Sequence, residues 1–290
     1  MKILLTGSTG FLGRFVFDYF LAKGVEIQGV ARNIPFMNEN KQFQTQLDLT
    51  NFEQVDHYFR DFQPDVVIHN AAMSKPDVCA QFPREAWLQN VETTRFLVEK
   101  TNPSAHFIYI SSDFVLGDDG PHSEQANYHP LNYYGVTKQA AELYVKERVG
   151  LSTIVRPVFI YGPQLPGSRG SFIQWVAAQL KAGNTIKVVN DQWRTPTFAP
   201  DIAKALFEIV TKKVGGLFHI AGSDYLTPYQ MAVEVAHHLH LNESLIHAVD
   251  ELSFPEPVKR AKQGGLKNSK AIEELNFKPT ALADALSLCF

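Results

Sequence analysis

Short apolar runs alternate with amphipathic stretches through the first half of the chain. The stretches carry apolar residues at helical spacing, as Phe11, Phe15 and Tyr19 do, whereas the runs have the length of strands. The expected strands are residues 2–5, 25–30, 43–47, 66–69, 106–110 and 153–157, and the expected helices are residues 11–22, 52–61, 84–100 and 132–148. Strands separated by helices predict right-handed crossovers and a parallel sheet with both faces covered. We therefore predict an α/β fold with a doubly wound, Rossmann-type parallel sheet.

A different pattern begins after Tyr161-Gly162-Pro163. Residues 164–170 are rich in turn formers, and residues 251–267 are expected to be mostly loop because they include Pro255 and Pro257. Helices are expected at residues 171–182, 200–211 and 228–238, and a strand at residues 217–220. In the last helix Thr227 is the expected N-cap.

This change of pattern suggests that the chain folds into two structural parts. We predict a dinucleotide-binding domain over residues 1–162 and a smaller α/β substrate-binding lobe over residues 163–290. Residues 217–220 are expected to return to the main sheet. The substrate is expected in the cleft between the two parts.

The composition excludes several classes of protein function. The 290 residues carry a net charge of −3, which provides no basic field for nucleic acid or anionic lipid. The longest apolar runs have strand length and are far too short to span a bilayer. With only two cysteines, no disulfide framework is expected, and a cytoplasmic protein is predicted.

A glycine loop, Thr6-Gly7-Ser8-Thr9-Gly10-Phe11-Leu12-Gly13, joins the first expected strand to the first expected helix. Gly7 would permit a tight turn, Gly10 the approach of a phosphate, and Gly13 close packing of helix and strand. Such a loop seats a dinucleotide's pyrophosphate on backbone N–H groups at a helix N-terminus. The alternative is an ordinary strand-to-helix turn.

The end of the second strand indicates which dinucleotide is bound. An acidic residue here would bind a ribose 2′-hydroxyl, but the sequence reads Val30-Ala31-Arg32-Asn33. Arg32 suits a 2′-phosphate, which favours NADP(H) over NAD(H); a solvated surface arginine is the alternative. Asp48, after the third strand, could accept a hydrogen bond from the adenine amino group. Its alternative is a helix N-cap, for which Thr50 is better placed.

The fourth strand ends at Asn70, Ala71 and Ala72. The small alanines would let a cofactor lie close, with simple tight packing as the alternative. The complete set of expected cofactor-binding residues is Gly7, Thr9, Gly10, Phe11, Leu12, Gly13, Arg32, Asp48, Leu49, Asn70, Ala71, Ala72, Tyr134 and Lys138.

Tyr134 and Lys138 are four residues apart and therefore lie on one helix face. A phenol has a pKa near ~10, and a nearby cation lowers the pKa by favouring phenolate. Such a tyrosine can exchange a proton with a carbonyl or alcohol. Ser112, in Ser111-Ser112-Asp113 after the strand 106–110, could hydrogen-bond the substrate oxygen.

No metal site is expected. His237, His238 and His240 cluster at a helix end without an accompanying carboxylate or cysteine motif. Asp118-Asp119-Gly120 lacks the ligand spacing of a calcium loop.

The glycine loop and the Tyr134–Lys138 pair resemble the extended short-chain dehydrogenase/reductases, most closely the dTDP-4-dehydrorhamnose reductase family. Residues 110–118 are similar to the family's I-S-T-D-Y-V-F-D-G, with Ser112 at the catalytic threonine position. Residues 191–197 resemble D-Q-x-G-x-P-T, with Arg194 replacing the glycine, and residues 216–222 resemble G-x-Y-H-x-x-G. Residues 260–270 resemble a terminal R-P-x-x-S-x-L-x-x-x-K more loosely.

This resemblance implies an NADP(H)-dependent reductase of a nucleotide-linked keto sugar, as in dTDP-L-rhamnose synthesis. Tyr134 would deliver the proton, Lys138 would lower the pKa of Tyr134 and hold the nicotinamide ribose, and Ser112 would polarise the carbonyl. The expected substrate-binding residues are Ser112, Asp113, Trp193, Arg194 and Arg260. The two arginines are proposed because a diphosphate requires cations.

Other functions on the same fold stay open. A sugar-nucleotide epimerase uses the same tyrosine and lysine but would not need Arg32, and a 4,6-dehydratase would need Glu where Phe114 follows Asp113. The resemblance also reaches the regulatory β subunit of methionine adenosyltransferase, which implies a non-catalytic alternative. A homodimer is compatible with each of these.

Overall fold

The computed structural model describes residues 1–34, 41–167, 170–254 and 258–290. Its main sheet has seven parallel strands, and the sequence-based prediction of a Rossmann-type α/β fold is confirmed. In spatial order the strands are β10 (Gly216–Ile220), β6 (Ser152–Pro157), β5 (His106–Ile110), β4 (Val66–His69), β1 (Lys2–Thr6), β2 (Glu26–Ala31) and β3 (Gln44–Gln46). Because all seven are parallel, the loops after β1, β2, β4 and β5 meet at one edge.

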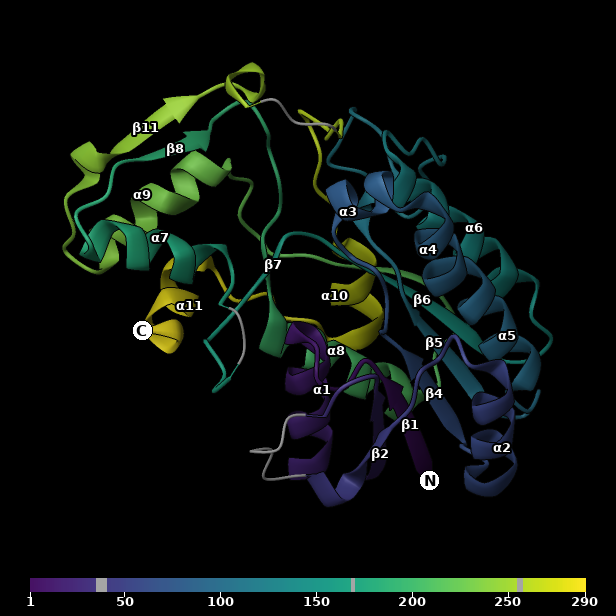
Figure 1. Ribbon diagram of the computed structural model, residues 1–290. Coiled ribbons are helices and arrows are strands. Elements are labelled where there is room, and N and C mark those ends of the chain that lie inside the picture. The colour runs from purple at the N-terminus through teal and green to yellow at the C-terminus, as the bar shows by residue number, and fades with distance from the viewer. Residues whose placement is uncertain (35–40, 168–169, 255–257) are drawn as a thin grey trace.

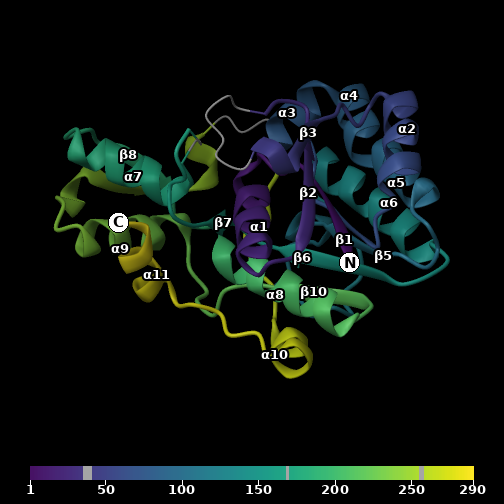
Figure 2. The same cartoon turned by 90° about the horizontal axis from the view of Figure 1, so that it is seen from below.

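Helices cover both faces of this sheet (Figure 1). One face carries α1 (Phe11–Ala22), α8 (Ala199–Lys212) and α10 (Ser269–Leu275). The other carries α2 (Phe52–Phe62), α5 (Thr93–Lys100) and α6 (Tyr133–Glu147). Figure 2, seen from below, shows α1, α8 and α10 away from α2, α5 and α6.

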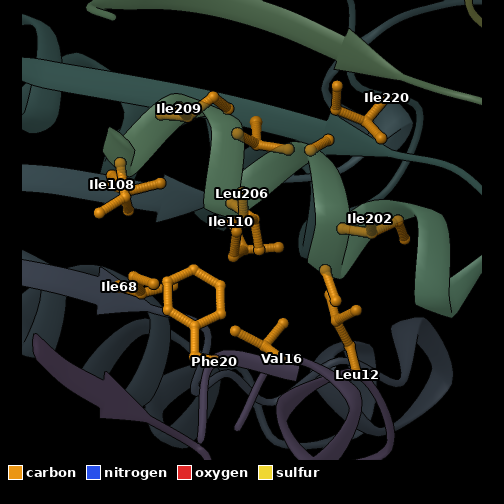
Figure 3. Packing of buried hydrophobic residues seen from close by; sticks show 14 of the residues in the cluster. Leu12, Val16, Phe20, Ile68, Ile108, Ile110, Ile202, Leu206, Ile209 and Ile220 are labelled. Atoms are coloured by element: carbon orange, nitrogen blue, oxygen red, sulfur yellow. The ribbon is translucent and has the colours of Figure 1, made fainter. Parts of the chain in front are cut away.

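Branched aliphatic side chains from α1, α8 and the sheet fill the core between them. Leu206 and Ile209 of α8 lie over Ile110 and Ile108, and Phe20 of α1 lies beside Ile68 (Figure 3). Continuous apolar strands such as β1 and β4 are typical of parallel sheets buried on both faces. This packing fixes the sheet edge on which the site is built.

Elements from the second half of the chain form a separate lobe, at the upper left of Figure 1. Its two-stranded parallel sheet pairs β8 (Ile186–Val189) with β11 (Ile246–Val249). Its helices are α7 (Phe172–Lys181), α9 (Pro228–His238) and α11 (Leu282–Cys289). A short parallel pair, β7 (Ile160–Tyr161) with β9 (Thr197–Phe198), lies where the chain passes between the two bodies.

The main body takes residues from both sides of residue 162. Strand β10 pairs with β6 in the register Phe218 to Val155, so residues 217–220 lie in the main sheet. Helices α8 and α10 also pack on this sheet. Thr227 caps α9 as predicted, since its Oγ1 accepts a hydrogen bond from Gln230 N at 3.2 Å.

Several elements differ from the sequence-based expectation. The single helix expected at residues 84–100 is α4 (Pro83–Trp87), a π-helical segment η2 (Leu88–Glu92) and α5. Helix α3 (Pro76–Gln81), strands β8 and β11, and helices α10 and α11 were not predicted. The short 3₁₀ turns are η1 (Lys41–Phe43), η3 (Asp113–Val115), η4 (Glu243–Leu245) and η5 (Glu251–Ser253).

Parts of two predicted loops, residues 168–169 together with Pro255 and Pro257, lie outside the described residues. Within the described ranges, no helix combines the length and apolar character needed to cross a membrane.

Candidate active site

A cavity of about 640 Å³ opens at the carboxyl edge of the main sheet. It is lined by the loops after β1 to β5 and by the first turns of α6. The predicted cofactor residues that line it are Gly7, Thr9, Gly10, Phe11, Leu12, Arg32, Asp48, Leu49, Asn70, Ala71, Ala72, Tyr134 and Lys138. The structure therefore gathers residues from five separate loops around one space.

The glycine loop is tightly packed against its neighbours. Gly7 has φ +67°, and a Cβ there would come within 2.9 Å of Ala71 Cα. Gly13 lies behind the loop, where a Cβ would stand 2.0 Å from the Gly7 carbonyl oxygen. Both positions therefore require glycine, and α1 can begin directly beside the cavity at Phe11.

The start of α1 is suited to an anion. Gly10 is the N-cap residue and has no side chain to cap the helix. The first N–H groups of a helix have no partner within the helix, and they carry its positive dipole end. The residues present thus fit a phosphate group of a dinucleotide.

Arg32 lies exposed at the rim of this cavity, directly after β2. Asp48 lies nearby, and its pKa is lowered mainly by the Thr50 backbone N–H, which donates to its Oδ1 at 3.0 Å, with a smaller effect from the charge of Arg32. The N-cap of α2 is Asn51, which accepts from Gln54 N at 3.1 Å. The suggestion that Asp48 or Thr50 caps this helix is therefore wrong: the cap is Asn51, the residue directly before the helix start at Phe52.

Behind the cavity floor, a chain of buried hydrogen bonds holds β1 and β4 together. Thr6 Oγ1 accepts from the N–H groups of Asn70 at 3.1 Å and Ala71 at 3.0 Å, so its own proton points to His69 Nδ1 at 2.8 Å. His69 Nε2 then carries the other proton and donates to Thr94 Oγ1 at 3.0 Å. Burial lowers the pKa of His69 to about 3, which keeps the ring neutral.

Asn90 continues this support toward α6. Its Oδ1 accepts from Met73 N at 2.7 Å, and its Nδ2 donates to Met73 O at 3.1 Å and to Thr137 Oγ1 at 3.0 Å. Asn90 lies in η2, the π-helical segment, where a helix widens by one residue per turn. Sequence reasoning missed Asn90, together with Gln89 and Thr93, which line the cavity. No local sequence signal distinguishes a π turn from an ordinary helix.

The three predicted catalytic residues line the same cavity and are nearly buried. Ser112 is 9 %, Tyr134 7 % and Lys138 2 % exposed. Ser112 precedes the turn η3, and its hydroxyl donates a hydrogen bond to Asp113 Oδ1 at 3.0 Å. Tyr134 lies in the first turn of α6, whose N-cap, Asn132, accepts from Gly135 N at 3.0 Å.

The electrostatics of this group differ from the expectation. Burial raises the pKa of Tyr134 well above its ordinary value, and the contact with Ser112 acts in the opposite direction. Lys138 Nζ donates to Ile110 O at 2.7 Å and lies 4.2 Å from the centre of the Tyr109 ring, and Lys138 is not among the groups that shift the pKa of Tyr134. The structure therefore does not support the prediction that Lys138 lowers the pKa of Tyr134.

Lys138 is itself strongly perturbed. Burial lowers the pKa of Lys138 to about 7, while Glu142 acts in the opposite direction. Glu142 lies one turn further along α6, is fully buried and forms an ion pair with Arg156. Tyr128 also donates to Glu142, at 2.6 Å. A strongly shifted lysine in a cavity is typical of functional sites.

The predicted substrate residues are divided between this cavity and its surroundings. Asp113 and Ser112 line the large cavity. Arg194 lines instead a second space of about 10 Å³, which Asp113 shares. Its guanidinium is buried and donates to Trp193 O at 2.7 Å and Ala261 O at 2.6 Å. Arg194 thus holds the 258–266 segment in place, which differs from the predicted role of an open diphosphate ligand.

The other two predicted substrate residues lie in the same region. Arg260 donates to Asp77 Oδ2 of α3 at 2.9 Å and forms an ion pair with it. Trp193 stacks on Tyr225 with ring centres 5.3 Å apart, which gives the indole a packing role. Among the described residues, neither Arg260 nor Trp193 lines the large cavity.

No group of three or more histidine, cysteine or acidic residues suited to a metal ion is found in the described part of the chain.

The sequence of this chain is similar to one known protein family and to curated relatives. A family described as the RmlD substrate binding domain matches residues 1–290. The methionine adenosyltransferase 2 subunit beta of Rattus norvegicus is 31 % identical over 260 residues, which cover 86 % of this chain and 75 % of that protein.

Two solved structures have the same fold. A dTDP-4-dehydrorhamnose reductase ortholog from Clostridium acetobutylicum superposes with a TM-score of 0.86 at 27 % identity, over 99 % of this chain and 98 % of that chain. The dTDP-4-dehydrorhamnose reductase of Bacillus anthracis, solved in complex with NADP, gives a TM-score of 0.87 at 23 % identity, again over 99 % and 98 %.

Proposed function

We propose, from the premise that this chain belongs to the RmlD substrate binding domain family, that it is an NADP(H)-dependent reductase of a nucleotide-linked keto sugar. One observation carries the proposal. The cavity that contains the glycine loop and Arg32 also contains Ser112, Tyr134 and Lys138. A dinucleotide site and a proton donor therefore share one space, as a carbonyl reductase requires.

The cofactor assignment rests on the shape and charge of the cavity. The glycine loop and the uncapped start of α1 suit the pyrophosphate, and Arg32 suits a 2′-phosphate. A related structure contains NADP, in agreement with this assignment; NAD(H) is the alternative cofactor. When bound, the nicotinamide supplies the hydride.

The chain's own residues supply the proton and orient the substrate. Tyr134, the acid, keeps its proton at neutral pH because burial raises its pKa, and it donates this proton as charge develops on the substrate oxygen. Ser112 lines the same cavity and provides a hydroxyl that can hydrogen-bond the same oxygen. Lys138 lies one turn from Tyr134 and holds a ribose hydroxyl.

The substrate proposed is a nucleotide-linked 4-keto sugar, with dTDP-4-dehydrorhamnose as the first candidate, because reductases of this name share the fold. Arg260 forms an ion pair with Asp77, three residues beyond the cavity-lining Ser74, and is proposed to help bind the diphosphate. An epimerase is less well supported, since it would not need Arg32.

The test is turnover. The purified protein is incubated with NADPH and a panel of dTDP-, UDP- and GDP-linked 4-keto sugars, and NADPH oxidation and the product alcohol are measured. Tyr134→Phe serves as the control. Oxidation with at least one sugar nucleotide, lost in the control, supports the proposal; NADPH binding without turnover on the whole panel contradicts it.

A second candidate is a regulatory subunit. It is favoured by the 31 % identity to methionine adenosyltransferase 2 subunit beta. Co-purification with the methionine adenosyltransferase catalytic subunit, and a change in its kinetics on mixing, would support this function. Tyr134→Phe should not affect such binding, which separates the two candidates.

We further propose a cytoplasmic location, because both Cys79 and Cys289 are free thiols, and a homodimer. Sedimentation of the purified protein tests the oligomeric state.

A further inference from the structure

We propose that His219 is a positioning residue for the substrate, which acts by fixing the 258–266 segment beside the reacting groups. His219 lies in β10, within the motif of residues 216–222, and the proposed reaction gives it no chemical step. The inference rests on the proposed function, because Arg260 of this segment is proposed to bind the diphosphate. Three observations support it: the partners of the imidazole ring, the contacts of the segment, and the residues that border both the segment and the cavity.

The ring of His219 is fully buried and has a partner at each nitrogen. Its Nδ1 lies 3.2 Å from the main-chain carbonyl oxygen of His122, which can only accept a hydrogen bond, so Nδ1 carries the proton and donates. Burial lowers the pKa of His219 to about 3, with a smaller effect from the charge of Arg156, so the ring is neutral at physiological pH. In the neutral ring Nε2 offers a lone pair, which accepts from Arg156 NH1 at 3.4 Å. One tautomer thus serves both contacts.

Arg156 is held in place independently of His219. Its guanidinium is buried and donates to both carboxylate oxygens of Glu142 on α6, at 2.8 and 2.6 Å. The main-chain N–H of His219 is also paired, since it donates to Glu124 Oε1 at 3.1 Å. The main sheet therefore holds the imidazole so that its Nδ1–H points in one direction, toward the main chain of His122.

The main chain of His122 is a point at which the main body holds the 258–266 segment. His122 N donates to Gly265 O at 3.0 Å, and His122 O accepts from Lys267 N, directly after the segment, at 2.7 Å. A carbonyl oxygen has two lone pairs, and the second one accepts from His219 Nδ1. The ring of His219 therefore fixes the carbonyl group on which the end of the segment is bound.

The segment also lines the second space, next to the part of the large cavity that contains the reacting groups. Gly264 and Gly265 line the space of about 10 Å³ together with Asp113, which lines the large cavity as well. Arg260 belongs to the same segment. A shift of the segment therefore moves the proposed diphosphate ligand relative to the site of hydride transfer, and a bound substrate loses its alignment.

Two substitutions separate the two contacts of the ring. In His219→Asn the amide nitrogen can take the place of Nδ1 and keep the bond to His122 O. In His219→Gln the amide oxygen can take the place of Nε2 and keep only the contact with Arg156. The matched control is His106→Gln, which changes another buried histidine of the main sheet, at the start of β5, whose Nε2 lies 2.7 Å from Thr153 Oγ1. All three variants are expected to lose stability, so melting temperatures alone do not decide.

The kinetic test uses NADPH and the sugar nucleotide that gives turnover in the panel above. We expect His219→Gln to raise KM for this sugar nucleotide about ten-fold, with kcat and NADPH affinity unchanged. His219→Asn and His106→Gln should keep a KM close to that of wild type. An equal KM in His219→Asn and His219→Gln, or a weaker affinity for NADPH in His219→Gln, would mean that the histidine only stabilises the fold, and overturns the inference.

Hydrogen exchange and NMR need no substrate and separate this inference from the proposed function. We expect the amides of residues 263–267 to exchange faster in His219→Gln than in wild type, His219→Asn and His106→Gln. In ¹⁵N-histidine spectra of the wild-type protein, one histidine should carry its proton on Nδ1 and stay neutral below the ordinary histidine pKa of ~6.5. Equal exchange in all four proteins, or the absence of such a histidine from the wild-type spectrum, overturns the inference even if the protein is a reductase.

Discussion

The carboxylate of Glu142 accepts two hydrogen bonds from the guanidinium of Arg156, at 2.8 and 2.6 Å, one helical turn beyond Lys138. Both side chains are buried, at 0 % and 1 % exposed. This pair ties α6, which carries Tyr134 and Lys138, to strand β6 of the main sheet. It also places a negative charge on the helix face of the perturbed lysine.

Glu142→Gln is expected to lower the free energy of unfolding by ~3–5 kcal/mol, because it leaves the charge of Arg156 buried without its partner. Chemical denaturation measures this loss. The control is Glu208→Gln, which breaks the exposed pair with Lys212 at 3.3 Å and should cost at most ~1 kcal/mol. Equal losses of unfolding free energy in the two variants would show that the buried pair stabilises the fold no more than the exposed pair does.

Lys138 should make stability depend on pH. Because burial lowers its pKa to about 7 in the folded protein, against 10.5 for an exposed lysine, the unfolded chain binds more protons between these two values. Stability from this group therefore rises as the pH increases from about 7 toward 10.5, and is lowest below 7.

Lys138→Met removes this dependence. Its melting temperature, relative to wild type, should be highest near or below neutral pH, and the advantage should shrink as the pH rises. Thermal melts of both proteins across this range provide the measurement. A difference that does not change with pH would mean that Lys138 is not perturbed as described.

Tyr134→Phe should lower kcat by ~10²–10⁴-fold, because it removes the positioned acid. NADPH affinity should change little, since the ring still packs against Phe114, with ring centres 5.4 Å apart. Steady-state kinetics and a binding titration measure the two effects. Activity within a few-fold of wild type would exclude Tyr134 as the proton donor.

Arg32→Ala should remove the preference for NADPH over NADH. Hydrogen bonds to a charged phosphate contribute ~1.5–3 kcal/mol, which corresponds to about ten- to a hundred-fold in affinity. Titrations with both cofactors test this, and NADH affinity is the internal control. Equal affinities in the wild type would make Arg32 an ordinary surface residue.

Arg260→Ala should raise KM for the sugar nucleotide and leave NADPH affinity unchanged. Because Arg260 is paired with Asp77, Asp77→Asn should have a related effect, and the double variant should be less impaired than the two single effects would predict by addition. Kinetics of the three variants form a double-mutant cycle. Additive effects would mean that the pair does not act as a unit.

The sequence predicted the main sheet well because its strands and helices have clear periodicity. The candidate catalytic and cofactor residues that line the cavity could be named from the sequence because the glycine loop and the Tyr134–Lys138 spacing are local signals. The β8–β11 sheet could not be predicted, since two four-residue strands nearly sixty residues apart have no local mark of their pairing. The partners of Arg194 and Lys138 depend on burial and on distant carbonyl groups, which no spacing encodes.

The position of β10 in the sheet determines when the main sheet can be completed during synthesis. On the ribosome, β6 is synthesised about sixty residues before its outer neighbour, so a nascent chain exposes the backbone edge of β6 until residue 220 has emerged. Helix α8, which packs against α1, is also synthesised late in the chain. The main sheet is therefore completed only by the second half of the chain, and a fragment ending at residue 162 would lack both its edge strand and part of its core.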